Sequence, residues 1–232
     1  MTKVLRGKTY IDILYDRRKF GDLEWVTRDW TCAKYQFSKD RSPKQIQHEV
    51  FESPRVQYII KEICDEKKMS QEEVTKAAEK ILQEMSHNLQ LSAIRLFGFL
   101  LAKFKKQVYT SIYVNLDGIE QLRACSVEYP VLLLPTHRSY VDFLLISYVC
   151  YHFNLPIPAI AAGLDFLGLK ALNLLLRNSG AFFIRRLFGG DKLYWAVFTE
   201  YVQNQLLGGE APLEFFVEGT RSRTAKSLNP KL

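Results

Sequence analysis

Apolar residues recur at helical spacing in the first half of the chain and in short bulky runs in the second half. A helix that begins at Ser53-Pro54 is predicted by three- and four-residue steps between Val56, Ile59, Ile60 and Ile63. Ser70-Gln71-Glu72-Glu73 reads as a capping box, and an apolar stripe runs from residue 74 to residue 89 behind it. The sequence therefore predicts two consecutive helices here.

Beyond residue 125 the two kinds of pattern alternate. Buried strands are predicted over residues 131–134, 157–161, 181–184 and 213–217. Helices are predicted over residues 141–151 and 166–177, and from an Asp191 N-cap to a stop at Gly208-Gly209. Strict alternation favours an α/β fold with a mostly parallel sheet and crossover helices.

Three regions follow from these patterns. Residues 1–48 show no stable period, so we expect a poorly defined, loosely packed N-terminal extension. Residues 49–118 are predicted to form a small helical region. The residues Asn115-Leu116-Asp117-Gly118 are typical of a turn, so we predict a domain boundary near residues 110–125. Residues 119–232 are then predicted to form the α/β domain.

His137 and Asp142 lie five positions apart, where the first of these strands gives way to a helix. A histidine titrates near neutrality and can take a proton from an alcohol, while a carboxylate fixes its tautomer. The pair predicts a general-base dyad; the alternative is a packed histidine beside a helix-capping aspartate. Ser139 and Cys150 are not assigned as nucleophiles.

Two further blocks run from an apolar strand into charged residues, at residues 180–186 and 215–223. Together with His137-Arg138-Ser139-Tyr140-Val141-Asp142, they resemble the first three signature blocks of the glycerolipid acyltransferases. Over roughly residues 50–232 the sequence is most similar to the branch that acts on dihydroxyacetone phosphate. The resemblance implies O-acyl transfer from a long-chain acyl-CoA to that acceptor's hydroxyl. Alternatives are a glycerol 3-phosphate acceptor, or a truncated inactive form that acts through protein interactions.

The resemblance also implies the substrate-binding residues. Arg186 is the first choice for the acceptor's phosphate, with Arg185 on the opposite face of the extended segment. Replacing Arg186 by alanine is expected to raise the KM for the acceptor more than that for acyl-CoA. Glu218 and Gly219 are assigned to acceptor binding, and Arg221 and Arg223 would offset the charge of the glutamate.

The chain carries a net charge of +7, which suits anionic partners. The positive residues are scattered and no nucleic-acid-binding motif accompanies them, so we expect no nucleic acid partner. The four histidines lack metal-ligand spacing, and neither a metal nor a cofactor is predicted beyond acyl-CoA as co-substrate. The four cysteines form no C-x-x-C pair, which fits a reducing compartment.

No apolar stretch reaches the length of a membrane-spanning helix, so peripheral membrane contact is predicted. Residues 91–106 either lie in a membrane interface or form a core helix with a solvated basic end. The resemblance implies the lumenal face of the peroxisomal membrane and, as a partner, alkylglycerone-phosphate synthase. The family's fourth block is absent, so we expect an incomplete sheet, weak activity and self-association.

Overall fold

The computed structural model describes residues 2–5, 7–32, 34–139, 141–164, 170–185 and 189–231. The strands are β1 (Thr2–Leu5), β2 (Lys8–Asp12), β3 (Tyr113–Asn115), β4 (Leu132–Leu133), β5 (Ala159–Gly163), β6 (Ala181–Ile184) and β7 (Leu213–Glu214). The helices are α1 (Ile13–Lys19), α2 (Asp22–Thr27), α3 (Pro43–Phe51), α4 (Pro54–Lys67), α5 (Gln71–Met85), α6 (Leu91–Val108), α7 (Leu116–Glu128), α8 (Asp142–His152), α9 (Lys170–Asn178) and α10 (Lys192–Gly208).

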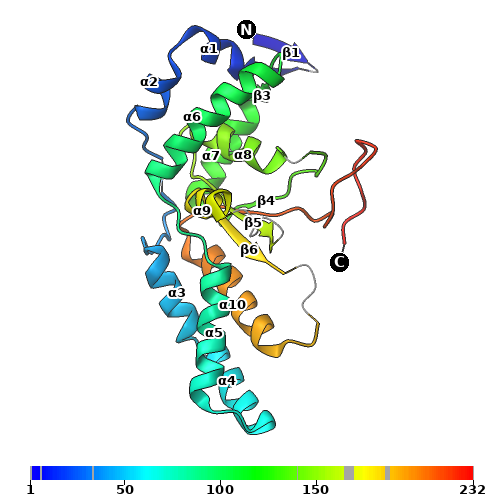
Figure 1. Ribbon diagram of the computed structural model, residues 1–232. Helices are drawn as coiled ribbons and strands as arrows, with labels where there is room; N and C mark the ends of the chain where they lie inside the picture. The colour runs from blue at the N-terminus through cyan, green and yellow to red at the C-terminus, as the bar shows by residue number, and fades with distance from the viewer. Residues whose placement is uncertain are drawn as a thin grey trace.

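The central sheet is parallel and has the strand order β4-β7-β5-β6. In Figure 1 it lies at mid-height, with α6, α7 and α8 above it and α3, α4, α5 and α10 below it. The predicted α/β class, with crossover helices and a preceding helical region, is confirmed. Since parallel strands share a direction, the residues that follow β4, β7 and β6 meet at one edge of the sheet.

Each face of this sheet packs against its own hydrophobic core. Phe182 joins the cluster formed with α3, α4, α5 and α10, whereas the next residue, Phe183, belongs to a cluster with α8 and α9. This alternation is expected, because successive side chains of a strand point to opposite faces. A third cluster joins α1, α2, α6 and α8. The sheet is therefore covered on both sides, as parallel sheets require.

Local capping chemistry fixes several helix starts at the predicted residues. Ser70 Oγ accepts from the Glu73 backbone N–H at 3.3 Å, and the Ser70 N–H donates to Glu73 Oε2 at 3.1 Å. Ser53 caps α4 with Pro54 in its first turn, and Asp191 accepts from the Tyr194 N–H at 3.0 Å to start α10. Gly209 ends α10 with φ +68°, the left-handed conformation that glycine adopts without strain.

The N-terminal segment is not loosely packed, which corrects the sequence-based expectation. β1, β2 and β3 form an antiparallel sheet, with Asp12 opposite Tyr113. Directly after β2, Ile13 and Leu14 are fully buried, and Trp25 is 5% exposed. These contacts join residues about one hundred positions apart, so no local pattern could reveal them.

Several predicted boundaries differ from the structure. The turn expected at residues 115–118 is the first turn of α7, because Asn115 Oδ1 accepts from the Gly118 N–H at 2.8 Å and caps a helix. The predicted strand 213–217 shortens to Leu213–Glu214, and helix 74–89 ends at Met85. The predicted helix 166–177 begins at Lys170, and residues 166–169 lie outside the described residues. Helix α3 was not predicted.

Within the described residues, no helix combines the length and the hydrophobicity needed to cross a bilayer.

Candidate active site

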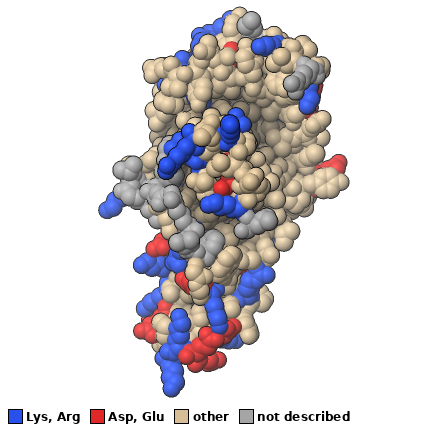
Figure 2. Space-filling model, turned by 90° about the vertical axis from the view of Figure 1, so that its right-hand side faces the viewer, with Lys and Arg blue, Asp and Glu red and all other residues tan. Residues whose placement is uncertain are grey.

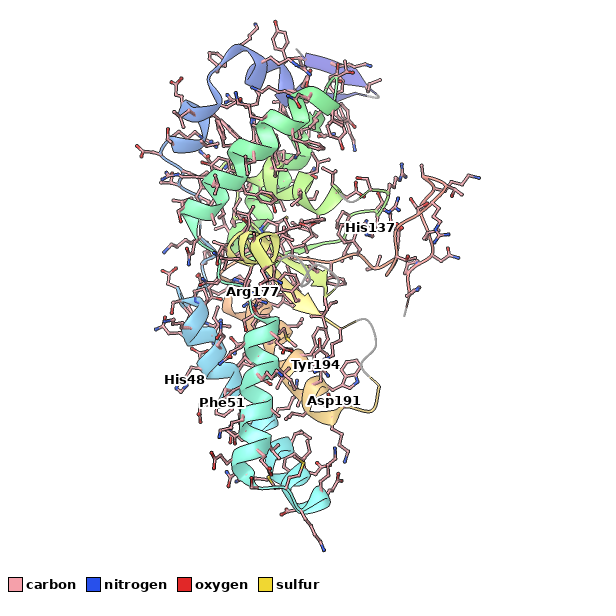
Figure 3. The ribbon with its side chains drawn as sticks, viewed as in Figure 1. His48, Phe51, His137, Arg177, Asp191 and Tyr194 are labelled. Atoms are coloured by element: carbon pink, nitrogen blue, oxygen red, sulfur yellow. The ribbon has the colours of Figure 1, made fainter. Side chains whose placement is uncertain are left out.

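The candidate site lies at the carboxyl edge of the parallel sheet. His137 follows β4 and Glu218 follows β7, and these two strands are neighbours. Figure 3 shows His137 facing the C-terminal segment on the side where the sheet edge opens, and Figure 2 shows Lys and Arg side chains gathered at the middle of that face. The edge thus brings a base, a carboxylate and positive charge together.

The structure brings His137 and Asp142 together. Their Nδ1 and Oδ2 atoms are 3.6 Å apart, within ion-pair range but longer than a hydrogen bond. The two side chains are 20% and 22% exposed, so a small substrate can reach the imidazole. Because Nδ1 faces the carboxylate, Nε2 is the nitrogen left for a substrate hydroxyl. Catalytic hydrogen bonds are often long before substrate binds.

Asp142 also shapes the loop that carries His137. Its Oδ2 accepts the backbone N–H groups of Arg138 and Ser139, both at 2.6 Å, and its Oδ1 accepts from Ser139 Oγ at 2.9 Å. Burial alone would raise the pKa of Asp142, but these donors and His137 outweigh it and hold the pKa below its usual value. The carboxylate therefore stays charged beside the imidazole and orders the strand-to-helix turn.

The segment that follows β7 also contacts His137. The rings of His137 and Phe216 lie 4.3 Å apart with an interplanar angle of 34°. The buried Ser222 donates its backbone N–H to the His137 carbonyl at 2.8 Å. Sequence analysis assigned no role to Phe216 or Ser222, because both contacts depend on β7 pairing with β4. Their position inside the third block was the only available signal.

The other third-block residues surround this contact. Glu218 is 3% exposed, and within the described ranges its Oε2 has no hydrogen-bond partner. Gly219 has φ +63°, and a Cβ added there would lie 3.0 Å from Lys231 Cδ, so this turn favours glycine. Arg221 is partly buried and Arg223 is exposed. The third block thus carries a buried carboxylate and, within five residues of it in sequence, two arginines that can bind an anionic ligand.

Arg185 takes a different direction. Its Nη1 donates to Asp191 Oδ2 at 2.7 Å, and its guanidinium lies 4.2 Å from the Tyr194 ring centroid. Asp191 and Tyr194 lie well apart from His137 in Figure 3. The structure therefore places Arg185 beside α10 and not beside the dyad. Arg186, the first choice for the phosphate, lies outside the described residues.

A family model described as "Acyltransferase" matches residues 113–232, which include the strands of the parallel sheet and the dyad. The chain belongs to the acyltransferase family. Among its described residues, no group of three or more His, Cys, Asp or Glu side chains is placed to hold a metal ion.

Three curated relatives of this chain carry two different names. "Dihydroxyacetone phosphate acyltransferase" from Oryctolagus cuniculus and from Homo sapiens are each 49% identical to it over 220 residues, 95% of this chain. "Glycerol-3-phosphate acyltransferase" from Pseudomonas fluorescens (strain SBW25) is 38% identical over 178 residues, 77% of this chain. The chain spans 32% of the length of the first two and 21% of the third.

Proposed function

We propose that this chain transfers a long-chain acyl group from acyl-CoA to the hydroxyl of dihydroxyacetone phosphate, a step of ether-lipid synthesis. The observation that carries the proposal is the 49% identity to dihydroxyacetone phosphate acyltransferases over 95% of the chain. The chemistry at the sheet edge agrees with it, because a histidine beside a charged carboxylate suits proton removal from an alcohol.

The reaction balances with His137 as the only proton carrier. Nε2 takes the proton of the acceptor hydroxyl while the oxygen attacks the thioester carbonyl carbon. The tetrahedral intermediate then collapses, the carbon–sulfur bond breaks, and the imidazolium returns its proton to the coenzyme A thiolate. Asp142 stabilises the imidazolium between the two steps.

We assign phosphate recognition to three arginines of the second and third blocks. Arg221 and Arg223 supply positive charge next to Glu218, and Arg186 is proposed as the bidentate phosphate contact. Glu218 and Gly219 would then contact the acceptor's oxygen atoms. An ionised Glu218 repels a phosphate, so its proposed role depends on this neighbouring positive charge.

Glycerol 3-phosphate is the second candidate acceptor. It is favoured by the relatives named for that activity, at 38% identity over 77% of the chain. The two acceptors differ only at C2, a carbonyl against a hydroxyl.

Both acceptors can be tested with the purified chain and palmitoyl-CoA as donor. The release of free coenzyme A is measured with each acceptor in turn. A higher kcat/KM for dihydroxyacetone phosphate supports the proposal. A preference for glycerol 3-phosphate contradicts the acceptor assignment, and turnover of neither acceptor favours the interaction-only form.

We also propose that α6 contacts a membrane surface, as an enzyme with a lipid product requires. Leu96, Leu100, Phe104 and Val108 recur every four residues on one face of α6 and are 44–56% exposed. The helix contains no acidic residue, and Lys103 is exposed beside the stripe. An apolar stripe flanked by lysine suits an anionic lipid interface. The peroxisomal location and the alkylglycerone-phosphate synthase partner stay predictions from resemblance.

Replacing Leu96 and Leu100 together by glutamate is expected to weaken vesicle binding about tenfold, because apolar contact is lost and negative charge is gained. Co-sedimentation with vesicles containing phosphatidylserine measures this. Tyr58→Glu is the control, since Tyr58 is 66% exposed on α4 and away from the stripe. Equal binding of the α6 variant and the wild type would exclude this surface.

A further inference from the structure

A groove of about 330 Å³ lies between α4, α5 and the start of α10. Its floor is apolar and is formed by buried side chains of all three helices: Ile63, Val74, Ile81 and Leu193. Met69, which is 41% exposed, stands at the rim. A hollow with an apolar floor and an open rim suits a flat ligand that is partly apolar.

The rim of this groove carries more positive than negative charge. Lys67, Lys80 and Arg185 line it, together with Glu84 and Asp191. Arg185 Nη1 pairs with Asp191 Oδ2 at 2.7 Å. Lys80 Nζ lies 3.9 Å from Glu84 Oε1 on an exposed helix face. Within the part of the chain that the structure describes, Lys67 forms no ion pair. The groove therefore has a surplus cation and a second lysine that is only weakly neutralised.

One residue that lines the groove, Arg185, lies at the same sheet edge as the dyad. Arg185 follows β6, whereas His137 follows β4, and three strand-to-strand steps separate these strands. With about 4.8 Å per step, the two strand ends lie about 14 Å apart. His137 and Asp191 lie on the same side of the molecule in Figure 3, and Figure 2 shows lysines and arginines intermingled with acidic residues at the lower end of that face. A long, extended ligand can connect the two places.

We infer that this groove binds the adenosine 3′-phosphate end of the acyl-CoA donor, with the pantetheine arm crossing the sheet edge to present the thioester at His137. The inference rests on the proposed function, which supplies acyl-CoA as the donor. The apolar floor accepts the adenine ring, and Lys67 and Lys80 face the phosphates. The acceptor phosphate is assigned to Arg186 and the third-block arginines, so the two anionic substrates use different cations.

The test is binding of coenzyme A and of 3′-dephospho-coenzyme A, measured by calorimetry on the whole chain. Lys67→Ala combined with Lys80→Ala is expected to weaken coenzyme A binding about tenfold and dephospho-coenzyme A binding much less, because the lost contact is to the 3′-phosphate. Lys76→Ala is the matched control: Lys76 is an exposed lysine of α5 that pairs with Glu72 and does not line the groove. It is expected to leave both affinities unchanged.

Unchanged coenzyme A affinity in the double variant would overturn the groove assignment and leave the proposed donor standing. Equal weakening of both ligands would also overturn it, because the loss would then not involve the 3′-phosphate. A wild-type chain that binds no coenzyme A would overturn the donor assignment itself, and the groove inference with it. A KM for dihydroxyacetone phosphate that stays constant in the double variant supports separate sites for donor and acceptor.

Discussion

Replacing His137 by alanine is expected to lower kcat by about 10² to 10⁴, the usual contribution of a general base. The imidazole is the only titratable base that the structure places beside Asp142 at the sheet edge, among the residues described. Acceptor binding is assigned to Arg186 and the third-block arginines, so the KM values should change little. Initial rates at saturating palmitoyl-CoA and dihydroxyacetone phosphate measure the effect.

His48→Ala is the control for this experiment. His48 is an exposed residue of α3 and lies far from His137 in Figure 3, so its loss should leave kcat unchanged. Thermal melting checks that both variants fold. A His137→Ala protein that keeps wild-type kcat would remove the histidine from the mechanism.

Asp142→Asn separates the two roles of the carboxylate. An asparagine keeps an oxygen that accepts the Arg138 and Ser139 N–H groups, so the turn should survive. The negative charge beside Nδ1 is lost, and the imidazolium formed during proton removal is then less stable. We expect a lower kcat with an unchanged fold, and a pH profile whose acidic limb, where the base loses its proton, shifts to lower pH. A wild-type profile would show that Asp142 only orders the loop.

Sequence patterns correctly predicted the structural features that depend only on residues close together in the chain. The Ser70 capping box and the Gly209 stop are complete within a few residues, and both were found. At Asn115 the same kind of local signal gave a wrong prediction. An asparagine side chain that accepts the backbone N–H three residues later can begin either a turn or a helix. Only the packing of Ile119 against the core, where it is 6% exposed, favours the helix.

The site was predictable to the extent that it is local. His137 and Asp142 lie on one loop, so their spacing revealed them. Phe216 reaches His137 only because β7 is inserted beside β4, and strand order depends on the whole fold. The direction of Arg185 is fixed by Asp191 and Tyr194 of the next helix, and no feature of its own strand indicated this.

Glu214→Gln is expected to change the pH dependence of stability more than any other single substitution. Glu214 lies in β7 with an exposed fraction of 0%, and among the described residues neither carboxyl oxygen has a hydrogen-bond partner. Burial raises its pKa to about 9. In the unfolded chain the same group ionises near pH 4.5, so folding at neutral pH requires the uptake of a proton.

The sign of the effect follows from this linkage. A raised pKa gives full stability below about pH 4.5, and that stability is lost as pH rises toward about 9. Glutamine does not titrate, so the variant should gain stability relative to the wild type by about 1.4 kcal/mol per pH unit across this window. Urea unfolding at pH 5, 6, 7 and 8 measures the difference, with Glu79→Gln on the exposed face of α5 as the control. A difference that stays constant with pH would mean that Glu214 is ionised in the folded protein, and its carboxylate would then need a buried partner beneath α8.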